Sequence, residues 1–227
     1  MNETIIIGMS GGVDSAVAAS ILIQDGYNVE ALFMKNWDED DKEFCTAAKD
    51  YKDALQVCDK LNIPLRSIDL TKEYWDKVFK IFLKECEIGR TPNPDIICNR
   101  EIKFRTFLDY AINLGANKIA TGHYAKIKKQ SGLYHLLRGE DRSKDQSYFL
   151  YRLDQSQISK RIFPLDKINK NNVRKIADEL GFLNYDKKDS TGICFIGERN
   201  FRDFLRKFIK PKSGNIINNK GMTIGKH

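Results

Sequence analysis

The chain has 227 residues and a mass of 26.2 kDa, enough for one α/β domain with a sizeable core, or for one domain and part of a second. Its 41% hydrophobic and 30% charged residues exclude disordered and collagen-like chains, and its longest apolar stretches, such as residues 16–23, are too short to span a bilayer. There is no signal-peptide pattern, and five widely spaced cysteines without a CxxC pair argue against a disulfide framework and against a zinc or cluster site. We therefore expect a cytoplasmic protein without membrane attachment.

The net charge of +7 is unevenly distributed along the chain. Residues 1–60 carry 5 Lys and Arg against 12 Asp and Glu, whereas residues 61–227 carry 33 against 19. A basic portion of this kind suits a polyanionic partner such as nucleic acid, and a solubilising lysine-rich surface explains it equally well.

Apolar, β-rich runs alternate with helical patterns, which predicts βαβ units and a parallel sheet. The predicted strands are Thr4–Met9, Val29–Met34, Leu65–Leu70 and Lys118–Thr121. The predicted helices are Asp14–Gln24, a long helix ending near Leu61, a helix capped by Thr71, and then Ile102–Leu114, Gln146–Leu153 and Asn171–Leu180. The segments Tyr124–Lys129 and Leu133–Arg138 indicate a hairpin, and Gly89–Asn99 reads as a loop. Weak strand signals follow in Pro211–His227.

The strongest local signal is the loop SGGVDS at residues 10–15, between the first strand and the first helix. Its two glycines allow close backbone approach, and the helix that follows offers free N–H groups and a positive dipole end to phosphate oxygens. Ser10 and Ser15 add hydroxyl donors, and Asp14 is a candidate ligand for a Mg²⁺ ion that bridges the phosphates. The spacing is similar to the PP-loop of ATP pyrophosphatases, and the alternative is a glycine-rich turn without a ligand.

Two cysteines stand in polar, loop-like segments. Cys98 follows Asp95 in the segment Gly89–Asn99, and Cys194 lies within Asp189–Arg199. A thiol near a cation or a helix N-terminus becomes a reactive thiolate, and Asp95 is a candidate base. The helical positions of Cys45, Cys58 and Cys86 instead predict buried, inert thiols.

Three aromatic residues follow the basic segment near residue 144. Tyr148, Phe149 and Tyr151 are able to stack on nucleic-acid bases, but their helical spacing beside Leu150 favours a place in the core.

Six segments in one order, GMSGGVDS, GRTPNPDIICN, IKF, ATGHYA, KDQSYFL and STGICFIGERNF, resemble the bacterial tRNA-specific 2-thiouridylases. The resemblance runs from Ile5 to His227. It implies a Rossmann-like α/β fold of the PP-loop type over residues 1–190 and the start of a small, β-rich central tRNA-binding domain over residues 191–227. Family members are longer, so we expect that domain to be incomplete and the family's C-terminal β-barrel to be absent.

The resemblance also implies a set of functional residues. The implied ATP-binding residues are Gly8, Met9, Ser10, Gly11, Gly12, Val13, Asp14, Ser15, Met34 through its backbone, and Gly122. The implied tRNA-binding residues are Asn93, Pro94 and Asp95 at the target uridine, and His123, Lys144, Asp145 and Gln146 elsewhere. Cys194 is expected to carry a persulfide, with Cys98 as a second catalytic cysteine able to form a disulfide with it.

The implied reaction is ATP-dependent thiolation at C2 of the wobble uridine of tRNA. ATP and Mg²⁺ are the expected cofactors, and tRNA and a persulfide donor (a cysteine desulfurase or sulfur-relay protein) are the expected partners. Two alternatives stay open. One is another PP-loop adenylating ligase or amidotransferase, and the other is a non-catalytic nucleotide- or RNA-binding fragment.

Overall fold

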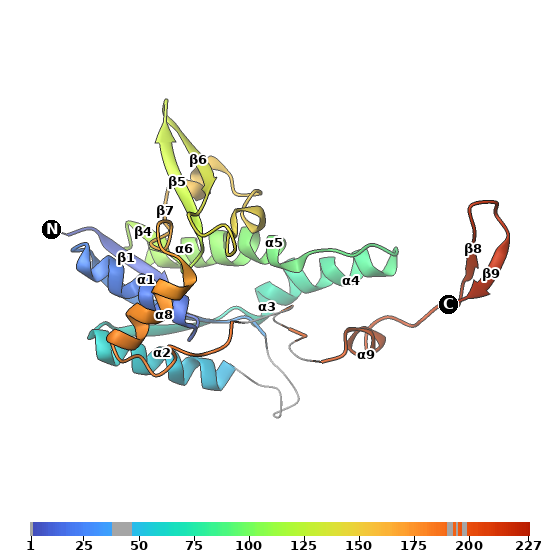
Figure 1. The fold of residues 1–227 in the computed structure, drawn as a ribbon, viewed down its shortest axis with the longest axis horizontal. Coiled ribbons are helices and arrows are strands. Elements are labelled where there is room, and N and C mark those ends of the chain that lie inside the picture. Colours follow the sequence, from blue (N-terminus) through green and yellow to red (C-terminus); the bar gives the residue numbers. More distant parts are fainter. Residues whose placement is uncertain (1, 38–46, 190–192, 194, 197–198) are drawn as a thin grey trace.

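Five parallel strands form one sheet in the order β3-β2-β1-β4-β7 in the computed structural model of the chain (Figure 1). The structure describes residues 2–37, 47–189, 193, 195–196 and 199–227, so Cys45 and Cys194 lie outside the described residues. The sheet strands are β1 Thr4–Gly8, β2 Asn28–Lys35, β3 Leu65–Asp69, β4 Lys118–Ala120 and β7 Arg161–Ile162. Two antiparallel hairpins join β5 Ala125–Gln130 with β6 Leu133–Arg138, and β8 Asn215–Ile217 with β9 Thr223–Lys226.

The helices connect and cover these strands. The α-helices are α1 Val13–Gln24, α2 Ala47–Leu61, α3 Thr71–Tyr74, α4 Lys80–Glu87, α5 Pro94–Cys98, α6 Phe107–Asn113, α7 Gln155–Ile158, α8 Lys170–Glu179 and α9 Phe201–Arg206. The π-helical segments η1 Trp75–Phe79 and η2 Asn99–Thr106 interrupt them, and η3 Ser147–Phe149 is a 3₁₀ turn. Among the described residues, no helix is both long and apolar enough to cross a membrane.

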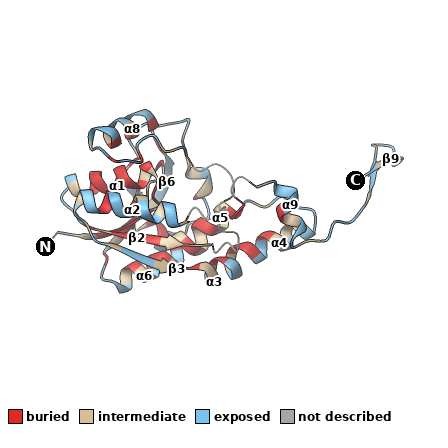
Figure 2. Ribbon diagram, turned by 90° about the horizontal axis from the view of Figure 1, so that it is seen from below, coloured by how far each residue is buried: buried red, intermediate tan, exposed pale blue. Residues whose placement is uncertain are grey.

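The sheet is covered on both faces because successive strand residues point to opposite sides. Ile5 and Ile7 pack with α1, α2 and α8, whereas Ile6 packs with η2 and α6 on the other face. The buried positions therefore lie along the strands and on the inner sides of the helices, as Figure 2 shows.

A third apolar cluster extends the core beyond the sheet. It brings η1 and α4 together with α5 and α9, through Phe79, Phe82, Cys98, Phe195 and Phe204. Phe195, Ile196 and Phe204 thus pack against helices of the first 100 residues, while the β8–β9 hairpin stands apart from this body (Figure 1). The division of the chain at residue 190 stays a prediction.

The predicted sheet strands and the β5–β6 hairpin are confirmed to within a residue or two, and β7 was not predicted. Three predictions are wrong. The loop ending at Asn99 contains α5 in its second half, and Gln146–Leu153 forms only the short turn η3. Thr71 does not cap its helix, since Leu70 holds that position and the Asp69 carboxylate accepts the Thr71 N–H.

Candidate functional site

The candidate site lies where the strand order reverses. The chain leaves β1 for β2 on one side, and β4 pairs with β1 on the other side. In open parallel sheets this switch point leaves a crevice beyond the carboxyl ends of the strands, where ligands bind. The loop after β1 and the residues that follow β4, Thr121–Tyr124, meet at this edge.

Two serines hold the loop after β1 in shape. The Ser15 hydroxyl donates to the Gly12 carbonyl at 2.9 Å, accepts the Ser10 N–H and lies 3.2 Å from the Ser10 hydroxyl oxygen. Gly12 is the N-cap of α1 and makes no side-chain capping bond. The first turn of this 12-residue helix therefore keeps backbone N–H groups for an anion.

Two glycines of the site are required by close backbone contacts. Gly11 has a φ of +76°, and a Cβ there would overlap the Asp50 carbonyl of α2. A Cβ on Gly122 would lie 2.7 Å from the Asp14 carbonyl carbon and 2.8 Å from the Ser15 nitrogen. The segment after β4 therefore rests directly against the start of α1.

The Asp14 carboxylate is fully engaged by protein groups. Lys170 Nζ donates to both of its oxygens at 2.8 Å, and the Tyr124 hydroxyl donates to Oδ1 at 2.7 Å. Burial, and then the nearby Asp14 charge, raise the Tyr124 pKa. The Lys170 ammonium group already neutralises this carboxylate at both oxygens, so these contacts do not favour Asp14 as a metal ligand. Asp14 instead orients the start of α1.

Lys170 continues this network to a second carboxylate. Its Nζ lies 2.7 Å from Asp189 Oδ1, and Lys144 Nζ lies 2.7 Å from Asp189 Oδ2. Hydrogen bonds from Lys144 and Lys170 outweigh the effect of burial and lower the Asp189 pKa, while the Asp189 hydrogen bond raises the Lys144 pKa. Arg174 approaches the same carboxylate at 3.4 Å.

A second lysine fixes the phosphate loop from behind. Lys187 Nζ donates to the Gly11 carbonyl at 3.1 Å and to the carboxylates of Asp50 and Asp53 in α2. Asn184 donates to the same Gly11 carbonyl at 3.0 Å. The side chains of Asn184 and Lys187 thus hold the loop, and Lys187 links it to α2.

Met34 lies on β2 beyond the end of β1. The Met9 N–H donates to the Leu32 carbonyl, so the backbone groups of Leu32 and, two residues on, Met34 point toward β1. Because β1 ends opposite Leu32, the backbone N–H and carbonyl of Met34 lie beyond the last residue pair between β1 and β2. This position suits backbone recognition of a heterocycle.

The segment around Cys98 is helical. The Asn93 side chain caps α5 by accepting the Asp95 N–H at 3.0 Å, and Pro94 takes the first helical position, where its missing N–H costs nothing. Cys98 at the helix end is 5% exposed, so the expectation of an open, loop-like setting is wrong for this thiol. Burial is the main cause that raises the Asp95 pKa, against the opposing charge of Lys103.

His123 connects this segment with the phosphate loop. It directly follows Gly122, and its Nδ1 lies 2.7 Å from the Thr121 hydroxyl oxygen. Burial first, and then the Lys103 charge, lower its pKa well below the ordinary 6.5, so the imidazole is neutral at pH 7. The His123 ring lies 5.7 Å from the Phe104 ring between centroids, so it packs against η2, which directly follows α5.

The three residues at 144–146 are tied to the same edge of the sheet. The side-chain Oε1 of Gln146 accepts the Tyr124 N–H, and the backbone N–H of Gln146 donates to the Tyr124 carbonyl. Asp145 accepts the Ser147 N–H and hydroxyl. The side chain of Lys144 is 40% exposed and stays accessible.

The predicted persulfide residue, Cys194, lies outside the described residues. Its described neighbours Ile193 and Phe195 share one apolar cluster with Cys98 and Ile97. The chain on either side of position 194 therefore returns to α5. The proposed disulfide partner of Cys98 stays a prediction.

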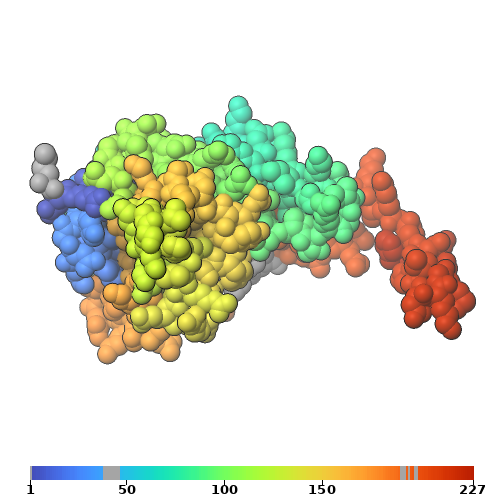
Figure 3. Space-filling model, turned by 90° about the horizontal axis from the view of Figure 1, so that it is seen from above, coloured from blue at the N-terminus to red at the C-terminus, as the bar shows by residue number. Residues whose placement is uncertain are grey.

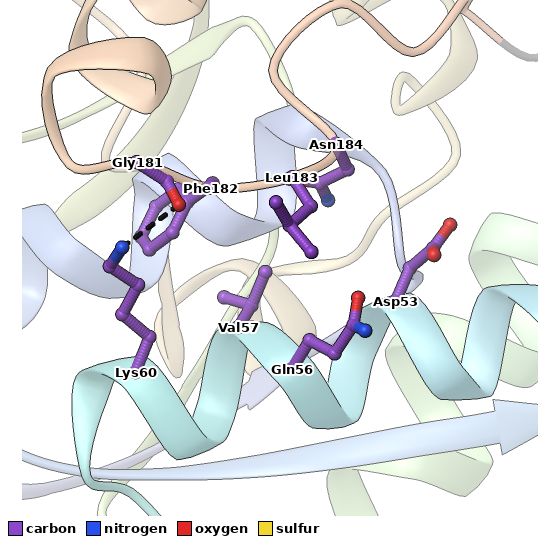
Figure 4. A pocket seen from close by; sticks show the side chains of 8 residues that line it. All are labelled: Asp53, Gln56, Val57, Lys60, Gly181, Phe182, Leu183 and Asn184. Carbon is purple, nitrogen blue, oxygen red and sulfur yellow. Dashed lines mark hydrogen bonds between the residues drawn. The ribbon is translucent and has the colours of Figure 1, made fainter.

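A separate cavity of about 260 Å³ lies between α2 and the segment after α8 (Figure 4). Lys60 closes one end by donating to the Gly181 carbonyl at 2.9 Å, and Val57 and Leu183 provide apolar walls. None of the site residues predicted from the sequence lines it, but Asp53 and Asn184, which take part in the contacts around Gly11 and Lys187, do.

A parallel sheet with a glycine-rich phosphate loop at its switch point defines a nucleotide-binding α/β domain. The chain belongs to the family whose model is described as the tRNA methyl transferase HUP domain, which matches residues 3–198. The predicted α/β fold class is thereby confirmed.

Curated relatives named tRNA-specific 2-thiouridylase MnmA match the chain over its whole length. They include proteins of Hydrogenovibrio crunogenus (55% identical), Shewanella sediminis (57%) and Shigella dysenteriae (56%). Each match covers 100% of this chain but only 60%, 61% and 63% of the respective relative. The chain thus spans about 60% of the length of these relatives, and the family resemblance seen in the sequence is confirmed.

Solved structures share the fold. A 4-thiouridine synthetase in an RNA complex with bound ATP aligns with a TM-score of 0.57 at 21% identity, over 90% of this chain and 49% of that chain. The U34-tRNA thiolase NcsA from Methanococcus maripaludis aligns with a TM-score of 0.52 at 19% identity, over 91% of this chain and 64% of that chain.

Sequence reasoning missed several residues of the site. Lys170, Tyr124, Lys187 and Lys103 were not predicted, and Asp189 was seen only as the first residue of a motif. A signal existed for Lys103, which stands in the IKF segment. Lys170 and Lys187 follow no local pattern, since Asp14 lies 156 residues from Lys170 and Gly11 lies 176 residues from Lys187.

Proposed function

We propose that the chain belongs to a tRNA 2-thiouridylase that activates the C2 oxygen of the wobble uridine with ATP and replaces that oxygen with sulfur. The main support is the contact between Gly122 and the phosphate loop, because the next residue, His123, packs against Phe104 of η2, the segment that directly follows α5. The proposal accordingly puts the phosphates and the uridine on either side of Gly122 and His123.

In this proposal the loop Gly8–Ser15 holds the ATP phosphates through backbone N–H groups, and the Met34 backbone meets the adenine. Asn93, Pro94 and Asp95 receive the uridine at the start of α5. The neutral His123 accepts or donates a hydrogen bond without adding charge, and Lys144–Gln146 contact the tRNA. No step is assigned to a metal ion, because Asp14 already holds Lys170.

The C2 oxygen of uridine is a poor leaving group, and the ATP-dependent step turns it into a good one. The C2 oxygen attacks the α-phosphate, pyrophosphate leaves, and the oxygen becomes part of AMP. The outer sulfur of a Cys194 persulfide adds to C2. The Cys98 thiolate then attacks the inner sulfur and breaks the S–S bond. The electrons of that bond remain on the outer sulfur and form C2=S as AMP departs. A Cys98–Cys194 disulfide remains, and an external thiol must reduce it.

The test is mass analysis of tRNA nucleosides after incubation with ATP, Mg²⁺ and a persulfide donor. We expect one wobble uridine to exchange oxygen for sulfur, and we expect Cys98→Ser and Cys194→Ser to abolish this exchange. Cys58→Ser, at a buried thiol of α2, is the matched control that keeps activity. AMP formation that needs neither Cys98 nor Cys194 would favour an amine-using ligase. ATP binding without AMP formation would favour a non-catalytic module.

A further inference from the structure

Two exposed tyrosines lie beside the candidate site. Tyr148 is 57% and Tyr151 is 66% exposed, although their spacing predicts core positions. The prediction is wrong because the segment forms the short turn η3 rather than a helix, and only Leu150, at 1% exposed, enters the core. The rings of Tyr148 and Phe149 lie 4.0 Å apart between centroids.

The turn that carries these rings is firmly held. Gln146 makes two hydrogen bonds with the Tyr124 backbone, and Asp145 accepts two from Ser147. On the inner side, Asn99 Nδ2 donates to the Phe149 carbonyl at 3.3 Å. A preorganised aromatic surface loses little conformational entropy when a flat partner stacks on it.

The turn that carries the tyrosines lies next to both groups of predicted tRNA-binding residues, those at α5 and those at 144–146. Asn99, which holds the turn, directly follows Cys98, and the predicted tRNA-binding residues 144–146 directly precede the turn. A strand that presents a uridine to α5 would therefore pass close to Tyr148 and Tyr151.

The charge around the turn suits a phosphate backbone. Gln155 exchanges two 2.8 Å hydrogen bonds with the Tyr134 backbone and so joins this region to the β5–β6 hairpin. Figure 3 shows the hairpin beside the segment that follows it in sequence. Residues 125–138 contain four Lys and Arg residues and no Asp or Glu. Arg152 is exposed and makes no hydrogen bond or ion pair with any described residue.

We propose that Tyr148 and Tyr151 form a stacking surface for unpaired RNA bases next to the target uridine, with the cations of the β5–β6 hairpin facing the phosphates. Every base has a π face, so such a surface binds single strands without reading their sequence. Aromatic rings set among cations favour RNA over an apolar protein partner. The inference rests on the proposed function, because that function supplies the RNA substrate.

The experiment measures binding of a fluorescent anticodon stem-loop RNA, with a fully paired duplex of equal length as the reference probe. We expect Tyr148→Ala and Tyr151→Ala each to raise the Kd for the stem-loop by about tenfold, with little change for the duplex. Tyr148→Phe and Tyr151→Phe should bind as the unchanged chain does, because the ring remains. Tyr185→Ala, at another exposed tyrosine, is the matched control.

Unchanged stem-loop binding by both alanine variants would overturn the inference. So would equal losses on the duplex, or a failure of the unchanged chain to bind the stem-loop. ATP affinity, measured in parallel, shows that each variant is folded. Tyrosine-dependent binding in a chain that does not thiolate tRNA would refute the proposed function alone, whereas thiolation with tyrosine-independent binding would refute the stacking surface alone.

Discussion

Lys170 Nζ lies 2.8 Å from both carboxylate oxygens of Asp14, although 156 residues separate the two positions. The Lys170 side chain is 8% exposed, and its third partner is Asp189. One buried ammonium group therefore joins the first turn of α1 to the first turn of α8 and to Asp189 in the segment after α8.

We expect Lys170→Met to lower the free energy of unfolding by about 2–3 kcal/mol, because it leaves the Asp14 carboxylate without its cation and removes one of the cations that hold Asp189. The value lies below that of a fully buried pair because the side chains of Asp14 and Asp189 are each 30% exposed. Urea denaturation measures it. Lys175→Met, at an exposed lysine of the same helix that pairs with Glu179, is the control and should cost less than about 0.5 kcal/mol. Equal losses for the two variants would contradict the structural role of Lys170.

Gly122→Ala should prevent the segment after β4 from resting on α1, because the added Cβ meets backbone atoms at 2.7–2.9 Å. Backbone atoms cannot rotate away as a side chain can, so we expect a lower Tm and loss of ATP binding. Gly12→Ala is the matched control for Tm, since its Cβ would meet only the Ser10 hydroxyl oxygen at 3.4 Å. Differential scanning calorimetry distinguishes the two, and a Tm for Gly122→Ala equal to that for Gly12→Ala would count against the contact.

The sequence was sufficient for the sheet and the phosphate loop because both are local patterns. Apolar strands and the SGGVDS loop are each defined by adjacent residues, and the structure shows β1, the loop and α1 in that order. The setting of Cys98 was not predictable in the same way. Cys98 shares its apolar cluster with Phe195 and Phe204, about 100 residues further along the chain, and no periodicity near Cys98 indicates them.

The exposure of Tyr148 and Tyr151 shows a second limit of prediction from the sequence. Their spacing matches a helix face, but Asp145 and Gln146 bind the turn and the Tyr124 backbone instead, which leads the segment into a 3₁₀ turn. Side-chain-to-backbone hydrogen bonds of this kind compete with helix formation and are weakly encoded in composition.

The stability of the chain should fall as the pH decreases below 6.5, in part because of His123. Its folded-state pKa is lowered below that ordinary value by burial and by Lys103, so the unfolded chain binds a proton that the folded chain does not. The stabilisation is present above pH 6.5 and decreases as the pH falls toward the folded-state pKa. Urea denaturation between pH 5.5 and 7.5 should show this slope, and His123→Gln should reduce it. His135→Gln, at an exposed histidine of β6, should leave it unchanged, and an unaltered slope in His123→Gln would contradict the assignment.

Cys58 should resist alkylation in the folded chain. Burial, and then the Asp59 charge, raise its thiol pKa to about 12, so the reactive thiolate is scarce at pH 8. Iodoacetamide labelling followed by peptide mass analysis should find Cys58 unmodified in buffer and modified in urea. Cys86, which is half-buried in α4, is the internal comparison and should react faster. Faster labelling of Cys58 than of Cys86 in buffer would show that α2 opens readily.

Lys187→Met should weaken ATP binding without removing any group that faces the phosphates. Lys187 holds the Gly11 carbonyl and the carboxylates of Asp50 and Asp53, so its loss frees the loop from α2 and leaves two neighbouring carboxylates to repel each other. Binding must then order the loop as well as the nucleotide, and we expect the Kd to rise about tenfold, or about 1.4 kcal/mol. Isothermal titration calorimetry measures this, with Lys188→Met at the exposed neighbouring residue as the control of equal charge. Asn184 still donates to the Gly11 carbonyl in Lys187→Met, so the double variant with Asn184→Ala should bind more weakly than either single variant. An unchanged Kd in the double variant would mean that the loop keeps its shape through Ser10 and Ser15 alone.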